Sequence, residues 1–176
     1  MLFQSQYRFF GTHADKVVKL TAEFEGQHKL FSFNHEVYQL APIVGFLYNR
    51  KAEKNREGGK DTSIFAEQMS NYKDVFHFNY QLIMLVDKNH EPDFDTRVDK
   101  AFRFYGTDKA NIDEELYESY VLGGVDVLYE KLIENSKAPE DYINNLYAFL
   151  KDFETRYGQI ADEIYKLCDY SGDKHV

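Results

Sequence analysis

Two carboxylate–histidine pairs stand three residues apart, a spacing that places both side chains on one face of a helix. They are Asp74 with His77 and Glu25 with His28. Such pairs supply ligands to di-iron centres in helical bundles, and a histidine beside a carboxylate can act as a general base. The second pair spans Gly26, where we expect a helix to end. Asp74 and His77 therefore remain as candidate catalytic residues, against the simpler interpretation that His77 is a hydrogen-bonded surface histidine.

The other motifs lack a residue that their chemistry requires. The sequence 35–39 begins with His-Glu, like a zinc-protease helix, but ends in glutamine where the second histidine would stand. The sequence 58–60, Gly-Gly-Lys, has neither the leading glycine nor the final hydroxyl of a phosphate-binding loop. The acidic residues within 91–99 do not follow calcium-loop spacing. We therefore expect no metal and no cofactor.

Length and composition favour one globular domain in a reducing compartment. The chain has 176 residues, within the usual size of a single domain. Its one cysteine, Cys168, excludes an intrachain disulfide framework. We find no signal-peptide pattern and no apolar run of about 18 residues that could span a bilayer. We expect a single domain over residues 1–176, located in the cytoplasm and not in a membrane.

Charge is distributed unevenly along the chain. Residues 1–88 carry 11 Lys and Arg against 10 Asp and Glu, whereas residues 89–176 carry 10 against 20, so the net charge of −9 comes from the second half. An acidic surface repels phosphate backbones, and we therefore expect no direct binding to nucleic acid. The same charge would speed encounter with a basic protein, although acidic composition is also an ordinary aid to solubility.

The segment 64–88 carries the pattern expected of a central helix. Its polar residues recur at helical spacing along one narrow line, and apolar residues occupy most of the remaining circumference. A strand over 75–82 is the alternative, but the alternation of polar and apolar residues stops after Gln81. We predict a mainly α fold, a bundle of about six to eight helices around this buried helix, with an N-terminal arm or short strand.

Apolar periodicity and capping residues predict further helices. They run from Thr12 to near Gly26, from Asn34, from Asp93 or Asp95 to Gly106, and from Asn111 through a capping box to about 135. Within the second of these, Pro42 predicts a kink or two short helices that meet at Ala41 and Pro42. Gly45 and Gly124 lie on apolar faces, where a missing side chain lets another helix approach; a kink at Gly123 and Gly124 is the alternative. We expect the charged sequence 50–60 to be a mobile loop.

The last predicted helix, within 139–168, has a heptad repeat. Its two series are Ile143, Leu150, Tyr157 and Ile164, and Leu146, Phe153, Ile160 and Leu167. This pattern is typical of a helix packed lengthwise in its own bundle; a seam for a second copy or a partner's helix is the alternative. On helix 111–135 the outer side is predicted to hold Glu115, Ser119, Leu122, Asp126 and Glu130.

Two functions fit these observations. The first is a non-catalytic protein-interaction or assembly subunit whose acidic second half binds a basic partner protein, or whose heptad helix docks on a partner or on a second copy. Its candidate partner-binding residues are Tyr165, which stands outside the heptad seam, and Glu115, Asp126 and Glu130. The alternative is a small helical hydrolase or an accessory subunit of a nucleic-acid-processing system, using Asp74, His77 and the acids within 91–99. The lack of a nucleophile–base motif favours the first.

Overall fold

The computed structural model describes residues 2–56, 60–138 and 140–169, with side chains through Gly158. Over these residues the protein is mainly helical, with 65% helix and seven α-helices, which confirms the predicted fold class. The elements are β1 (Tyr7–Phe10), α1 (Gly11–Leu20), α2 (Asn34–Leu47), β2 (Asp61–Ile64), α3 (Ala66–Asn71), α4 (Lys73–Val86), α5 (Phe94–Phe102), the 3₁₀ turn η1 (Asp108–Ala110), α6 (Asn111–Tyr129), the π-helical turn η2 (Glu130–Glu134) and α7 (Glu140–Asp169). None of the helices in these ranges is long and apolar enough to cross a membrane.

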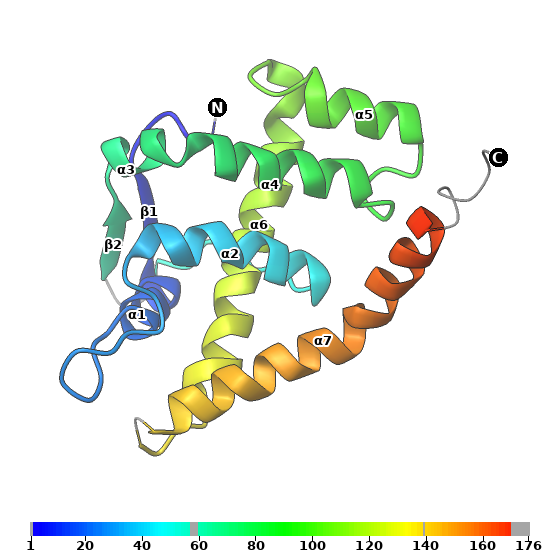
Figure 1. Ribbon diagram of the computed structural model, residues 1–176. Helices are drawn as coiled ribbons and strands as arrows, with labels where there is room; N and C mark the ends of the chain where they lie inside the picture. The colour runs from blue at the N-terminus through cyan, green and yellow to red at the C-terminus, as the bar shows by residue number, and fades with distance from the viewer. Residues whose placement is uncertain (1, 57–59, 139, 170–176) are drawn as a thin grey trace.

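Helix α6 is the centre of the bundle. Figure 1 shows it running through the middle of the molecule, with α1, α2 and α4 packed against it. Ten of its 19 residues are buried, among them Leu122, which the sequence pattern had placed on the outer side. The buried hydrophobic side chains of these helices form one cluster with those of the sheet.

The segment 64–88 is not the central helix that its pattern predicted. Ile64 ends β2, and Tyr72, with φ −106° and ψ 11°, separates α3 from α4. One side of α4 also remains exposed. Helix α6 can take the central place despite its acidic sequence because Asp113 and Asp126 are paired with cations from neighbouring elements. This pairing offsets much of the cost of burying a carboxylate.

Two glycines set the distance between α2 and α6. A Cβ atom on Gly124 would overlap the carbonyl oxygen of Ala41, and one on Gly45 would overlap that of Tyr120. The close helix approach predicted at these two glycines is therefore confirmed. Helix α6 is continuous through Gly123 and Gly124.

The loop that follows α2 packs on α6. The backbone amide of Ala52 donates to the carbonyl of Ser119 at 3.0 Å, and Lys54 forms an ion pair of 2.8 Å with a carboxylate of the same helix. The expectation of a mobile loop therefore does not hold for residues 50–56, because backbone and ionic contacts fix them to α6. Residues 57–59 of that loop lie outside the described residues.

The cap predicted at Asp93 is confirmed, whereas the caps predicted at Thr12 and Asn34 are wrong, because α1 and α2 begin directly after Phe10 and Phe33. The side chain of Asp93 accepts a hydrogen bond of 2.7 Å from the amide of Thr96 and so caps α5. Within the described residues no side chain caps the start of α6, where Ala110 precedes Asn111 directly out of the 3₁₀ turn. The capping box fails because the preceding turn already continues the helical backbone into α6.

Helix α1 ends earlier than predicted, and α2 is a single helix rather than two short helices that meet at Pro42. Helix α1 ends at Leu20 rather than near Gly26, and the Thr21 hydroxyl donates to the carbonyl of Val17 at 3.0 Å just after its end. Helix α2 is continuous through Pro42, which is buried. The helix therefore continues past the proline, although proline removes one backbone hydrogen bond.

The N-terminal strand is confirmed, and it pairs with a segment distant in sequence. Strands β1 and β2 are antiparallel, with Tyr7 opposite Ile64 and Phe10 opposite Asp61. Phe9 and Ile64 are fully buried. Because β2 leads directly into α3, this small sheet fastens the start of the chain to the α3–α4 segment.

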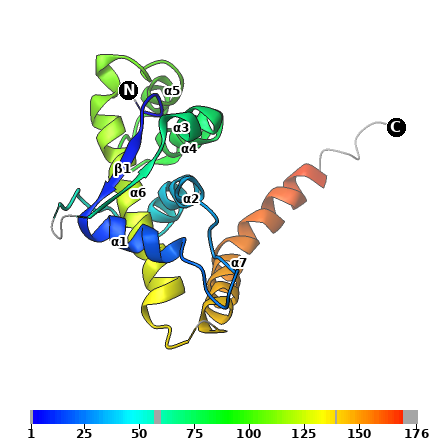
Figure 2. The ribbon, with the colours of Figure 1, turned by 90° about the vertical axis from the view of Figure 1, so that its left-hand side faces the viewer.

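Helix α7 packs on the body along one side only. Phe149 is buried against the ring of Tyr48, whose hydroxyl donates to Asp152 at 2.9 Å. Ile143 and Leu150, which belong to the heptad series, are 54% and 56% exposed. Figure 2 shows the C-terminal end of α7 running away from the body. Among the described members of the heptad series, Ile143 and Leu150 are therefore not covered by this chain, and the side chains of Ile160, Ile164 and Leu167 lie outside the described residues.

Candidate functional site

Asp74 and His77 are not arranged as a catalytic pair. Asp74 is exposed in the first turn of α4, whereas the ring of His77 packs against Tyr105 with centroids 4.3 Å apart. The Nε2 atom of His77 is buried and has no hydrogen-bond partner among the described residues. Burial, reinforced by Lys73 and opposed by Asp74, lowers the pKa of His77. Such a histidine is neutral, and its buried nitrogen is not placed to accept a proton from a substrate.

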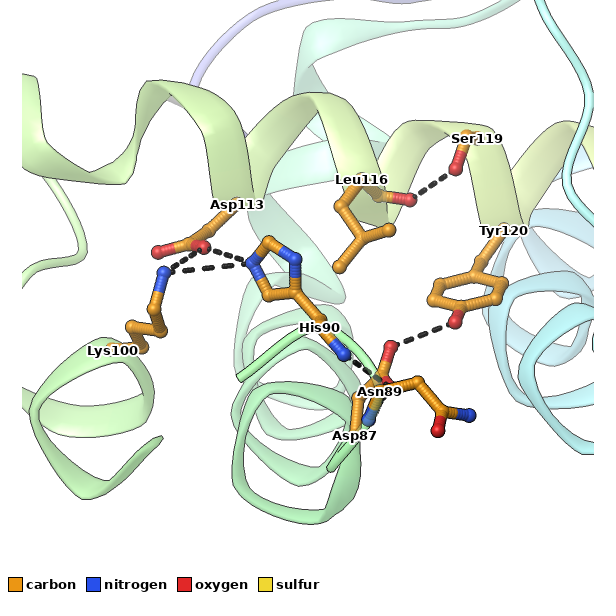
Figure 3. Close-up of polar contacts among 8 residues, drawn as sticks. All are labelled: Asp87, Asn89, His90, Lys100, Asp113, Leu116, Ser119 and Tyr120. Carbon is orange, nitrogen blue, oxygen red and sulfur yellow. Dashed lines mark hydrogen bonds and ion pairs between the residues drawn. The ribbon is translucent and has the colours of Figure 1, made fainter. Parts of the chain in front are cut away.

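A buried ionic cluster joins α5 and the loop before it to α6 (Figure 3). Oδ1 of the fully buried Asp113 accepts a hydrogen bond from Nζ of Lys100 at 2.7 Å and lies 2.6 Å from Nε2 of His90. Because a carboxylate oxygen only accepts, Nε2 carries a proton. The sequence did not single out this cluster, since its three residues are 10 and 13 positions apart and share no motif.

A second polar contact fixes the same loop to α6. The Tyr120 hydroxyl donates to Oδ2 of Asp87 at 2.7 Å, and Oδ1 of Asp87 accepts from the amides of Asn89 and His90, each at 3.1 Å (Figure 3). Burial, together with the bond to Asp87, raises the pKa of Tyr120, so the hydroxyl stays protonated and remains a donor. These contacts join residues of the protein to one another, so they stabilise the fold rather than form a site for a ligand.

Two of the acids predicted to bind a partner are engaged within the chain. Asp126 accepts a hydrogen bond from Lys16 at 2.7 Å and lies 3.3 Å from Nε2 of His13. Burial acts to raise the pKa of Asp126, but the hydrogen bonds from His13 and Lys16 outweigh burial and lower it. Glu130 pairs with Arg50 at 2.9 Å. Both acids therefore help to hold α1 and the loop after α2 against α6.

The remaining predicted partner-binding residues are Glu115 and Tyr165. Glu115 is exposed, on the solvent side where its spacing placed it. The side chain of Tyr165 lies outside the described residues. The exposed apolar residues of α7 that the structure does describe are Ile143, Tyr147 and Leu150.

Helix α4 exposes a line of apolar side chains, which we call the α4 stripe. Its members are Val75, Phe78, Leu82 and Val86, which are 38%, 62%, 38% and 41% exposed. They are three and four residues apart and so lie along one side of the helix. The apolar pattern of segment 64–88 had predicted that neighbouring helices cover these residues. Their spacing was visible in the sequence, but spacing alone does not reveal that no element of the described chain covers them.

An open groove of about 400 Å³ lies between α2 and α4. It is lined by Phe31, Glu36, Gln39, Leu40, Ile43 and Asn79. The side-chain amide of Asn79 donates to the carbonyl of Gln39 at 2.7 Å, which satisfies one buried polar group between the two helices. Asn79 and Leu82 are three residues apart, so the α4 stripe borders the groove. The exposed apolar side chains of α4 therefore stand beside the apolar residues of α2 that line the groove.

No group of three or more histidine, cysteine or acidic side chains is placed to hold a metal ion within the part of the chain that the structure describes. No protein-family model, no curated protein and no solved structure matches the chain. The function is therefore argued from the geometry of these surfaces.

Proposed function

We propose that this protein is a non-catalytic interaction subunit that binds a helix of a partner protein along the α4 stripe and the adjoining groove. The observation that supports this proposal is the exposure of four apolar side chains of one helix beside a groove lined by both apolar and polar side chains. Covering such side chains is favourable by about 25 cal/mol per Å² of apolar surface. Contiguous exposed apolar surface of this kind is typical of protein-binding sites.

The dimensions fit a helix as the ligand. The α4 stripe runs from Val75 to Val86, which corresponds to about 17 Å along the helix axis. About three turns of a second helix would cover this length. An amphipathic helix that lies in a groove presents apolar residues at i, i+3 or i+4, and i+7, and these would meet the side chains of α4 and α2.

The charges at the border favour a partner helix that carries basic residues. Glu36 lines the groove, and the exposed Asp74 lies on α4 one turn before Phe78. Lys88 follows the other end of α4 and is exposed. We therefore expect Lys or Arg on the partner near the N-terminal end of α4. The net charge of −9 would speed the encounter, and added salt would slow it.

The alternative function, a small hydrolase or an accessory subunit of a nucleic-acid-processing system, has less support. Its predicted residues do not form a pair, because Asp74 is exposed to solvent whereas the ring of His77 packs on Tyr105. His90 is held by a carboxylate, but that carboxylate is shared with Lys100 and joins two helices. The cytoplasm remains the expected location on the basis of composition.

Site-specific photo-crosslinking in the native cell would test the proposed surface. A photoreactive phenylalanine analogue is introduced at Phe78, in the α4 stripe, or at Ile112, which is 70% exposed on α6 and serves as the matched control. We expect a discrete covalent adduct with another protein from position 78 and none from position 112. Absence of an adduct at position 78, or equal adducts at both positions, would contradict the proposal, and an adduct only with a second copy would replace the partner by self-association.

Folding must be separated from binding in this test. Phe78→Asp places a charge at a solvent-exposed site and should leave the melting temperature of the protein unchanged while abolishing the adduct formed from a second reporter at Leu82. Met84→Asp, by contrast, places a charge at a residue that is 1% exposed and should unfold the protein. A Phe78→Asp protein that melts like the wild type yet still forms the adduct would rule out the α4 stripe.

A further inference from the structure

His35, the second residue of α2, lies between two aromatic rings. Its ring stacks on Phe33 at 5.4 Å between centroids and on Tyr72 at 4.2 Å, with interplanar angles of 13° and 21°. Tyr72 separates α3 from α4, so this stack fastens the α3–α4 junction to α2. The side chain of His35 is only 5% exposed, and its Nδ1 atom has no hydrogen-bond partner among the described residues.

A second histidine fastens α4 on another side. The ring of His77 packs on Tyr105, which follows α5, at 4.3 Å and 36°. Tyr80 lies 6.4 Å from the same ring. The α3–α4 segment is therefore held at two places by a neutral imidazole against a tyrosine, and in both histidines one buried ring nitrogen lacks a partner within the described chain.

The groups around His35 offer no ready acceptor for a second ring proton. Glu36 acts to raise the pKa of His35, but burial outweighs it, and Oε2 of its carboxylate already accepts hydrogen bonds from the backbone amides of Ser32 and Phe33 at 2.6 and 3.3 Å. The phenol of Tyr72 is the titratable group that faces His35 from the α3–α4 junction. His35 also stands in the first turn of α2, where the helix dipole disfavours a positive charge.

The groups around His77 are similarly unfavourable to a charge. Lys73, one turn earlier on α4, repels it, whereas the exposed Asp74 attracts it from solvent. Tyr80 and Tyr105, which face the ring from α4 and from the chain after α5, remain neutral because burial raises their pKa.

We infer that protonation of His35 and His77 releases α3 and the first half of α4 from α2 and from Tyr105. A positive charge on a ring whose buried nitrogen has no acceptor is costly, and release lets water solvate both rings. Burial lowers the pKa of both histidines in the closed state, so the released state binds protons more readily. The closed state is therefore fully favoured above the ordinary histidine pKa of about 6.5 and loses stability as the pH falls below it.

Release is a property of the chain alone and does not require a partner. Because the same segment carries the α4 stripe, release would also disrupt the proposed binding surface at acid pH. Failure of the partner experiment would leave this inference standing, since the conformational test uses the isolated protein.

Amide hydrogen exchange measured against pH tests the inference. After correction for the chemical exchange rate, we expect protection of amides 66–76 to fall at least about tenfold more than that of α6 amides between about pH 7.5 and about pH 5. The amides of 121–128 in buried α6 serve as the internal reference. Equal changes in both segments would overturn the inference.

Replacement of the histidines separates their titration from general acid sensitivity. The double variant His35→Phe with His77→Phe keeps two stacking rings without a titrating proton and should lose the selective change, whereas His28→Phe, at an exposed position, should keep it. Selective release that persists in the double variant would overturn the inference. If the double variant does not fold, the ring proton resonances of the wild type decide: both histidines should titrate below about 6.5, and titration at or above that value would overturn it.

Discussion

Gly124 of α6 lies directly against the carbonyl group of Ala41 in α2, with no room for a Cβ atom between them. This contact stands at the crossing of the two helices that make the most extensive contact in the molecule (Figure 1). The space that glycine leaves is filled by backbone of the neighbouring helix, and so a side chain at this position would have to push the two helices apart.

Gly124→Ala should therefore lower the free energy of unfolding by about 3 kcal/mol, because overpacking against a backbone atom cannot be relieved by a side-chain rotation. The matched control is Gly158→Ala on α7, where a Cβ atom would lie 3.7 Å from Cγ of Glu154 in ordinary contact. That change should stabilise by about 0.5–1 kcal/mol, since alanine favours a helix interior. Urea denaturation compares the two, and an unchanged midpoint for Gly124→Ala would contradict the packing.

The pairing of Asp113 with Lys100 should make their mutational effects strongly coupled. Asp113→Asn leaves the mostly buried Lys100 without its carboxylate and should cost about 3–5 kcal/mol. Combining it with Lys100→Met should cost about 1–3 kcal/mol less than the sum of the two single variants. Denaturation of the four proteins of this cycle measures the coupling, and simple additivity would show that the ion pair does not form.

Asp126 should make stability depend on pH in the acid range. Its pKa is lowered in the folded protein because the hydrogen bonds from His13 and Lys16 outweigh burial. The stabilisation is therefore fully present above the unfolded-state pKa of about 3.9 and is lost as the pH falls through the lower folded-state value. Asp126→Asn should cost about 2 kcal/mol at neutral pH. This difference from the wild type should shrink below about pH 4, and a constant difference would count against the assignment.

Local patterns in the sequence were sufficient to predict much of the secondary structure. The mainly helical fold, the N-terminal strand and the cap at Asp93 depend on residues within a few positions of one another. The close approach at Gly45 and Gly124 was also predictable, because a glycine on an apolar helix face leaves space that packing fills.

The tertiary structure determines which helix is central and which distant residues are in contact, and local patterns in the sequence do not. The apolar circumference of segment 64–88 predicted burial on most sides, but burial depends on which other elements reach a helix. Helix α6 became the central helix instead. Its two buried carboxylates are paired with residues distant in sequence: Asp113 with His90 and Lys100, and Asp126 with His13 and Lys16.

The candidate binding surface shows the same division. The sequence by itself determined that Val75, Phe78, Leu82 and Val86 share one side of a helix, because the period of 3.6 residues is a property of the backbone. Only the tertiary structure decided that this side stays exposed next to a groove with α2. The physical reason is that the hydrophobic effect is non-directional: it favours covering an apolar stripe but does not specify which element, in this chain or in another protein, provides the cover.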